Sequence, residues 1–357
     1  MGSRCHAEGR STDASLNMDA FIQLTAERQR RLCEAAGDSI GLDASSIEKD
    51  FWVCWTLREL FSLANSGPFL TFKGGTSLSK GWKLIERFSE DIDVVIDRDF
   101  LGFGGDQAPD KAPSRKQTEA RLEGLRSECQ KHIRHVLHPA LDRLFRERLS
   151  QNLTWKLEID PADKDQQTLL FEYPTAFAAG TYLLPVVKIE LGARSDTEPS
   201  LTPEIQPYVA DALPDEIGPS RFTLRTLAPE RTFWEKAMLL HEENILGMTK
   251  GPKVRLARHY YDLWCLIRAG VAERAAQDLP LFERAAAHRT VFFRKKKVAQ
   301  DSLRRGSLRI VPATEHRALW KKDYEQMREA MFFGDPPGFD EVLRVVEEFE
   351  RQFNLGA

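Results

Sequence analysis

The chain has 357 residues, of which 42% are hydrophobic, so it can form about two folded domains and is not a disordered or fibrous protein. Its 51 Lys and Arg residues are balanced by 54 Asp and Glu residues, and the formal net charge of −3 provides no overall attraction to nucleic acid. Five scattered cysteines without a Cys-x-x-Cys pair argue against a disulfide framework or a zinc site and favour a reducing cytoplasm. No apolar run reaches the roughly 20 residues of a membrane span, and residues 1–17 lack the apolar core of a secretory signal. We therefore expect a cytoplasmic protein with no membrane partner.

The amino-terminal half alternates helical patterns with short β-rich runs. A helix over 46–63, capped by Ser45 and Ser46, comes first. The other elements predicted for this half are, in chain order, strand 69–72, helix 76–88, strand 91–96, a long helix over 116–149 kinked by Pro139, and strands 154–159, 168–173, 182–191 and 221–227.

After Pro229 only helical patterns remain. The predicted helices span 230–244, 254–268, 272–288 with a break near Pro280, 312–331 and 339–353. The simplest division of the chain has three parts: a start that is disordered or derived from the expression vector (1–17), an α/β domain (18–228) and a helical carboxy-terminal domain (229–357).

The segments Lys73–Lys80 and Arg87–Asp93 are the most informative part of the sequence. Gly74 and Gly75 allow a tight turn with no Cβ in the way, and the amides of Thr76 and Ser77 then open a helix whose positive end can receive phosphate. A Walker-type P-loop does not fit, because its Lys must follow Gly and precede Ser or Thr, whereas Lys80 lies between Ser79 and Gly81.

Two carboxylates follow on the next predicted strand. Alternation along the strand places Asp91 and Asp93 on one face, where their oxygens can share hard cations, as two-metal phosphoryl transfer requires. The tripeptide alone is more typical of two solvated acids at a strand end. The preceding glycine turn and helix favour the functional interpretation.

These segments resemble the AbiEii/AbiGii nucleotidyltransferase toxins, a family within the DNA polymerase β-like nucleotidyltransferase superfamily. Residues 73–79 look like the family's Lys-Gly-Gly-Thr-Ser/Ala-Leu turn, and 87–93 look like its Arg-Phe-Ser-x-Asp-x-Asp motif. Further similar segments lie at 48–51, 231–236 and 258–263; the last has His259 where an acid is common.

The resemblance implies an α/β (α+β) fold: a polymerase β-like mixed sheet with flanking helices, followed by a helical domain. It also implies transfer of a nucleoside monophosphate from a nucleoside triphosphate (NTP) to an acceptor hydroxyl, with Mg²⁺ or Mn²⁺ as cofactor. The protein would be the toxin of a type IV-like toxin-antitoxin or abortive-infection system for phage defence, with an antitoxin partner and the 3′ end of a tRNA as acceptor. Two alternatives stay open: the same chemistry on a protein or an aminoglycoside-like small molecule, and a non-catalytic binding module that retains the fold.

The same resemblance implies roles for individual residues. Asp91, Asp93 and Glu190 would hold the metal, with Glu190 as an alternative general base; the alternation around Glu190 suits an edge-strand salt bridge with Lys188 equally well. Lys236 would neutralise triphosphate oxygens. The nucleotide-binding set comprises Lys73, Gly74, Gly75, Thr76, Ser77, Ser89 and Lys236.

Asp262 completes the implied catalytic set. It lies among apolar residues, where a buried acid needs a partner, and Lys236 and Arg258 are the candidates. The alternative is a salt bridge that only packs two helices together.

Ser89 precedes Asp91 by two residues, so we expect it on the same strand face, about 6 to 7 Å along the strand. A phosphate at Ser89 would add about two negative charges beside the metal-binding acids. Phosphorylation there is therefore predicted to inactivate the enzyme.

Basic stretches in the helical half suit an RNA backbone, and the two aromatic residues before the first stretch suit unstacked bases. The alternative is a solvated loop. The residues concerned are Phe292, Phe293, Arg294–Lys297, Arg304 and Arg305, and Lys250, Lys253, Arg255 and Arg258.

Overall fold

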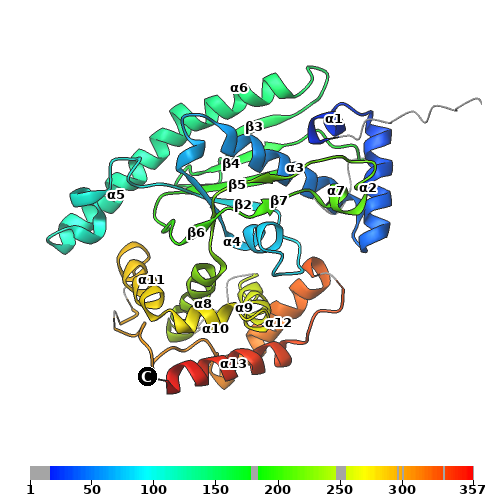
Figure 1. The fold of residues 1–357 in the computed structure, drawn as a ribbon. Coiled ribbons are helices and arrows are strands. Elements are labelled where there is room, and N and C mark those ends of the chain that lie inside the picture. The colour runs from blue at the N-terminus through cyan, green and yellow to red at the C-terminus, as the bar shows by residue number, and fades with distance from the viewer. Residues whose placement is uncertain are drawn as a thin grey trace, which may run out of the picture.

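The computed structural model describes residues 17–177, 184–246, 255–295, 297–299, 301–332 and 334–356. A mixed seven-stranded sheet with flanking helices occupies one part of the molecule, and a group of helices occupies the other (Figure 1). This is the fold class that the sequence predicts. Among the helices in the described ranges, none has the length and apolar character needed to cross a bilayer. The predicted disordered start lies outside the described residues, except for Asn17.

The large sheet has the strand order β3-β4-β5-β2-β1-β9-β6. Its central strand, β2, pairs in parallel with β5 and antiparallel with β1, which makes the sheet mixed. The predicted strand 221–227 is split: β8 pairs with β7 in a separate small sheet, and β9 joins the large one. The strands are β1 (Leu70–Lys73), β2 (Asp91–Ile96), β3 (Lys156–Ile159), β4 (Thr168–Glu172), β5 (Val186–Gly192), β6 (Ser200–Leu201), β7 (Glu204–Ile205), β8 (Phe222–Thr223) and β9 (Thr226–Leu227).

The first seven helices belong to the sheet-containing part. They are α1 (Met18–Ile22), α2 (Ala26–Ile40), α3 (Ala44–Ser62), α4 (Gly74–Thr76), α5 (Arg115–His132), α6 (His138–Arg148) and α7 (Tyr208–Ala212). The cap of α3 is Asp43 rather than the predicted Ser45 and Ser46: its carboxylate accepts a hydrogen bond from the Ser45 amide at 2.8 Å. Pro139 lies in the first turn of α6, and a π-helical turn over Ile133–Leu137 joins α6 to α5, so the predicted long helix changes its winding just before the proline and is not split there.

From Pro229 onward the described residues form six helices, in the order that the sequence predicts. They are α8 (Pro229–Leu246), α9 (Arg258–Arg268), α10 (Val271–Gln277), α11 (Leu279–Phe292), α12 (Thr314–Met331) and α13 (Phe339–Leu355).

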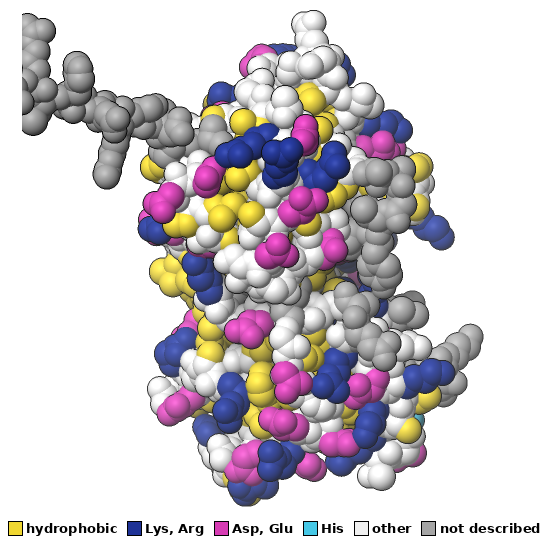
Figure 2. All heavy atoms as spheres, turned by 90° about the vertical axis from the view of Figure 1, so that its right-hand side faces the viewer, with side chains coloured by type: hydrophobic (Ala, Val, Ile, Leu, Met, Phe, Trp, Pro, Cys, Tyr) yellow, Lys and Arg dark blue, Asp and Glu magenta, His cyan; other side chains and the backbone are white. Residues whose placement is uncertain are grey.

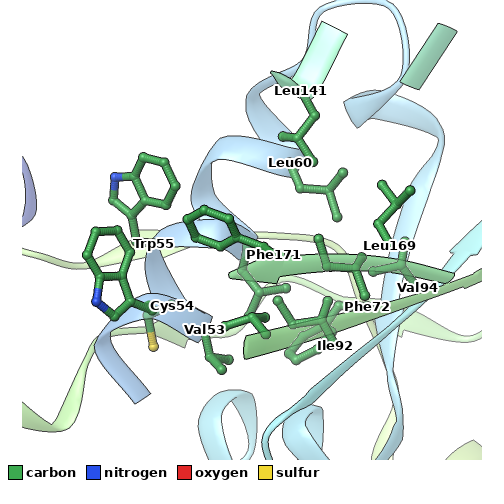
Figure 3. Close-up of a cluster of buried hydrophobic side chains, with 14 of the residues drawn as sticks. Val53, Cys54, Trp55, Leu60, Phe72, Ile92, Val94, Leu141, Leu169 and Phe171 are labelled. Atoms are coloured by element: carbon green, nitrogen blue, oxygen red, sulfur yellow. The ribbon is translucent and has the colours of Figure 1, made fainter. Parts of the chain in front are cut away.

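The first hydrophobic core lies between the sheet and the helices α3 and α6 (Figure 3). Trp55 of α3, Phe145 of α6 and Phe171 of β4 form its aromatic centre, with ring centroids 4.6 to 5.8 Å apart. Ile92 and Val94 point into this core from β2. Because side chains alternate along a strand, this burial turns Asp91 and Asp93 toward the opposite face of the sheet.

The second core lies among the helices after Pro229. There the Trp234 ring packs against those of Phe282 and Phe353, with ring centroids 4.8 and 5.0 Å away. Leu78 and Ile85, which come from the glycine-turn segment, also belong to this second core. The predicted domain boundary at 228 stays a prediction, but packing does not follow it strictly.

The predicted helix 76–88 is wrong in extent. The helical segment begins at Gly74, continues as a π-helical turn over Ser77–Gly81 and ends there. Residues 82–90 instead run alongside the carboxy-terminal helices: Arg87 forms a β-bridge with Phe332, and the Phe88 amide donates to the Met331 carbonyl at 2.7 Å. Tertiary pairing thus outweighs the local helical pattern.

Candidate active site

A cavity of about 360 Å³ opens where the sheet meets α8, α9 and α11. Five of the residues that the sequence predicts for nucleotide binding line it, together with two of the three predicted metal-binding acids. They are Lys73, Gly74, Gly75, Ser89 and Lys236, with Asp91 and Asp93. The structure therefore brings together side chains from β1, β2 and α8 that are more than 140 positions apart in the chain.

The glycine turn touches the acids directly. Gly74 has φ +82°, and a Cβ at this position would lie 1.9 Å from Oδ2 of Asp93. The predicted phosphate contact of Thr76 and Ser77 belongs to their backbone amides and stays a prediction, because both side chains are buried within the turn. The Thr76 hydroxyl donates to the Asp91 carbonyl at 2.5 Å and lies 2.8 Å from the Ser89 hydroxyl. It therefore fixes the turn against β2.

Ser89 was expected on the same strand as Asp91, but β2 begins only at Asp91, so Ser89 lies just before the strand. Its side chain still reaches the same cavity as Asp91. The proximity on which the phosphorylation prediction depends is therefore present.

The two carboxylates are half-buried and form no ion pair among the described residues. Burial, followed by the charge of Glu190, raises the pKa of Asp93 to about 7, and the same two causes raise the pKa of Asp91. In the described ranges, no Lys or Arg lies within ion-pair distance of either carboxylate. Oxygen donors of this kind suit a hard divalent cation, which would relieve their repulsion.

Glu190 has a divided position. It is opposite Asp93 in the parallel register of β2 and β5, one strand spacing away. Its carboxylate, however, pairs with Lys188 and lines a neighbouring depression rather than the main cavity. This is the salt bridge that the sequence allowed as the alternative.

Asp262 is fully buried beneath the cavity and binds two cations. It accepts two hydrogen bonds from Arg87, at 2.7 and 2.9 Å, and one from Lys236 at 2.8 Å. Lys236 is thus confirmed as a partner, whereas Arg258 lines the cavity instead, and the role of Arg87 was not foreseen. Burial alone would raise the pKa of Asp262, but Arg87 and Lys236 hold it far below its ordinary value.

A second ion pair lies on the other side of α8. The Lys73 ammonium donates to Glu235 at 3.0 Å and to the Ser195 hydroxyl at 2.9 Å. Burial opposes ionisation of Glu235, but Lys73 and then Arg231 hold its pKa down at about 2. Sequence reasoning assigned no role to Glu235 or Ser195; the position of Glu235 beside Lys236 in the Glu-Lys segment was the available signal.

The basic stretches are only partly available to a ligand. Arg255 and Arg258 line the cavity. Lys295 is engaged with Glu242 and Glu243, while Arg294 and Lys297 are exposed. Lys250, Lys253 and Lys296 lie outside the described residues.

Residues 55–345 match the protein family described as "Nucleotidyl transferase AbiEii toxin, Type IV TA system". No curated protein sequence matches the chain. Among solved structures, the chain is similar to MenT4, a nucleotidyltransferase toxin from Mycobacterium tuberculosis H37Rv, with 16% identity, coverage of 93% of this chain and 99% of that chain, and a TM-score of 0.35. The family match spans most of the chain and includes the turn, the carboxyl pair and the helices that bear Lys236 and Asp262. The chain therefore belongs to the AbiEii family of nucleotidyltransferase toxins from type IV toxin-antitoxin systems.

Proposed function

We propose that this toxin uses Mg²⁺ to transfer a nucleoside monophosphate from an NTP to the 3′-terminal hydroxyl of a tRNA, in the cytoplasm, and that its cognate antitoxin restrains this activity. The acceptor oxygen attacks the α-phosphorus while the bond to the bridging oxygen breaks, and pyrophosphate leaves. The acceptor hydroxyl gives its proton to a solvent water in the same step.

The observation that carries the proposal is the carboxyl pair beside the glycine turn, which forms no ion pair among the described residues. Asp91 and Asp93 would hold the divalent cation, and Glu190 would join them only after releasing Lys188. When bound, such a cation neutralises charge on phosphate oxygens and lowers the pKa of a bound hydroxyl. The fit rests on two carboxylates that form no ion pair among the described residues, although the charges of Lys73 and Lys236 act on Asp93 from farther away.

Cationic side chains of the chain itself complete the charge balance. Lys236 and Arg258 line the cavity, and Asp262 fixes the Lys236 ammonium at one position. A fixed cation stabilises the triphosphate without the reorganisation that a mobile surface lysine would need. Lys73 would serve the same end once an incoming phosphate competes with Glu235 for its ammonium.

The proposal of a tRNA acceptor depends on basic residues near the cavity and not on the net charge of the chain. Figure 2 shows a face on which basic and acidic side chains are interspersed, in keeping with the net charge of −3. Arg255 and Arg258 at the cavity are better placed to bind an RNA end than Lys295, which is already paired. Transfer to a protein or a small molecule would give a different labelled product in the experiment that follows. Membership of a nucleotidyltransferase family argues against the non-catalytic alternative.

The test is incubation of the purified protein with Mg²⁺, each α-labelled NTP in turn, and total RNA. Label in RNA of tRNA size supports the proposal and identifies the base. Label on protein, or on a small molecule alone, moves the acceptor. Absence of label everywhere with folded protein and a range of divalent metals would contradict the proposed reaction.

Gly74→Ala should abolish transfer. The new Cβ would collide with the Asp93 carboxylate, and a left-handed alanine also costs about 1–2 kcal/mol of stability. The measurement is transfer rate together with the free energy of unfolding in urea.

Gly102→Ala is the matched control, because Gly102 has φ +84° with nothing within 4 Å of the added Cβ. It should lose only the stability that the left-handed backbone costs, and it should keep full transfer activity. Equal activity in the two variants would show that the Gly74 contact with Asp93 is unimportant.

Ser89→Asp should lower transfer at least about 100-fold, because a carboxylate beside Asp91 and Asp93 repels the triphosphate and imitates phosphorylation. Ser89→Ala removes only a hydroxyl near Thr76 and should stay within about threefold of the wild type. Steady-state rates with saturating Mg²⁺ provide the comparison. A fully active Ser89→Asp variant would contradict the phosphorylation prediction.

A further inference from the structure

Glu235 of α8 lies between two cations and is hydrogen-bonded to one of them. Its Oε2 accepts a hydrogen bond from the Lys73 ammonium at 3.0 Å, whereas its Oε1 lies 3.6 Å from Nε of Arg231. The second distance is too long for a hydrogen bond. Arg231 and Glu235 are spaced i, i+4 on α8, so they are neighbours on one face of the helix. One carboxylate is therefore within reach of two partners.

Arg231 has a buried donor that forms no hydrogen bond. The side chain is only 1% exposed, and its Nη1 donates to Asp196 at 3.0 Å, which fixes the guanidinium. Its Nε is shielded from solvent and has no hydrogen-bond partner among the described residues. Such a group calls for an explanation, because it has given up its bond to water and gained none. A movement of about 0.5 Å would bring Oε1 of Glu235 within ordinary hydrogen-bond distance of this Nε.

Lys73 is the partner that a phosphate can take away from Glu235. It ends β1, immediately before Gly74, and lies opposite Asp93 in the antiparallel pairing of β1 with β2. Its side chain lines the active-site cavity, and its ammonium also donates to the neutral Ser195 hydroxyl at 2.9 Å. A phosphate that enters beside Asp93 would compete with Glu235 for this ammonium, because both are anionic acceptors.

Release of Lys73 would leave Glu235 as a mostly buried charge. Its side chain is 20% exposed. Burial opposes its ionisation, but Lys73 and then Arg231 hold its pKa at about 2, so the carboxylate is charged at pH 7. Removing one partner of a buried ion pair is strongly unfavourable. A hydrogen bond from Arg231 would reduce that penalty and would also satisfy the unpaired Nε.

We propose that Glu235 changes partner when the NTP binds: it pairs with Lys73 in the free enzyme and with Nε of Arg231 once a phosphate has taken Lys73. Arg231 is then a positioning residue, which acts on the substrate through Glu235 and Lys73 and not by touching it. This inference rests on the proposed function, because it needs a phosphate at Lys73.

The test is a double-mutant cycle on the affinity for inorganic tripolyphosphate in Mg²⁺. Arg231→Met should weaken binding by about tenfold or more when Glu235 is present, because the carboxylate then has no second partner and keeps Lys73. In the Glu235→Gln background, where no charge needs a new partner, the same change should alter the affinity by less than about twofold. Arg274→Met is the matched control: it removes an arginine that pairs with Glu230 of α8 at 2.8 Å outside the cavity, and it should leave the affinity unchanged.

A structure of the wild-type protein with Mg²⁺ and tripolyphosphate tests the same exchange without any substitution, and so applies even if Arg231→Met does not fold. The distance between Arg231 Nε and Glu235 Oε1 should fall from 3.6 Å to about 3 Å, and the distance between Lys73 Nζ and Glu235 Oε2 should rise from 3.0 Å to beyond about 4 Å.

Two results would overturn the inference. One is an equal loss of affinity from Arg231→Met in both backgrounds, which would mean that Arg231 contacts the phosphate itself or only supports the fold. The other is a tripolyphosphate complex in which Glu235 still pairs with Lys73. Either result, obtained with a wild-type protein that transfers nucleotide, leaves the proposed function intact. If the folded wild-type protein binds neither tripolyphosphate nor any of the four NTPs in Mg²⁺, the proposed function fails and the inference fails with it.

Discussion

Replacing Asp91 or Asp93 by asparagine should reduce nucleotidyl transfer by about 10³-fold or more. Loss of a metal-binding carboxylate removes several kcal/mol of transition-state stabilisation, and each 1.36 kcal/mol corresponds to a factor of ten in rate. Transfer of an α-labelled NTP under saturating Mg²⁺ measures the effect. Activity within about tenfold of the wild type in both variants would exclude this pair as the metal site.

The fold itself should tolerate these changes. Burial and the charge of Glu190 raise the pKa of Asp93 to about 7, so above pH 7 and without metal the folded state holds a half-buried carboxylate charge that has no ion-pair partner among the described residues. Removing that charge relieves repulsion, and the Tm of metal-free Asp93→Asn at pH 8 should be at least that of the wild type. Asp110→Asn, at an exposed acid outside the cavity, should keep both activity and Tm.

Asp262→Ala should be the most destabilising of the predicted substitutions. It removes the only carboxylate in ion-pair contact with Arg87 and Lys236 among the described residues, and both cations remain buried. Breaking a buried pair in this way costs about 3–5 kcal/mol. Urea unfolding at pH 7 measures the loss, and transfer should fall as well, because Lys236 is no longer fixed.

The control for Asp262 is a surface pair, Lys321 with Asp340, whose side chains are 49% and 78% exposed. Asp340→Ala should leave the urea midpoint unchanged, because solvent screens such pairs. An equal loss of unfolding free energy in the two variants would show that the buried contacts of Asp262 with Arg87 and Lys236 stabilise the fold no more than the surface pair does.

The stabilisation from Asp262 should also depend on pH with a defined sign. The folded-state pKa of Asp262 lies far below its unfolded value of about 4, so its contribution is fully present above that value and is lost as the pH falls below it. The difference in unfolding free energy between wild type and Asp262→Ala should therefore be constant from pH 7 to about 5 and shrink below about pH 4. A difference that grows in acid would contradict this account.

Local patterns in the sequence predict the elements of this fold well where neighbours in the chain decide the outcome. Strand β2 begins and ends at the predicted residues, because alternation of acids with buried Ile92 and Val94 is a local signal. The glycine turn and the carboxyl pair are adjacent in the cavity, as their spacing predicts.

Long-range pairing decides the features that sequence reasoning missed. The helix predicted to reach residue 88 stops at Gly81 because the following segment pairs with residues near 332. Arg87 as a partner of Asp262, and Glu235 as a partner of Lys73, join groups 162 to 175 positions apart. No local periodicity encodes such contacts, and a buried charge indicates only that a partner of opposite sign exists somewhere.

The interleaving of the two cores has a consequence for protein engineering. Leu78 and Ile85 pack with the helices after Pro229, although they precede that residue by more than 140 positions. A hybrid of two related toxins joined at the apparent boundary would pair this segment from one parent with helices from the other and mismatch the second core. In functional hybrids, residues 77–88 and the helical half should therefore come from the same parent, because these parts pack together although they are distant in the chain.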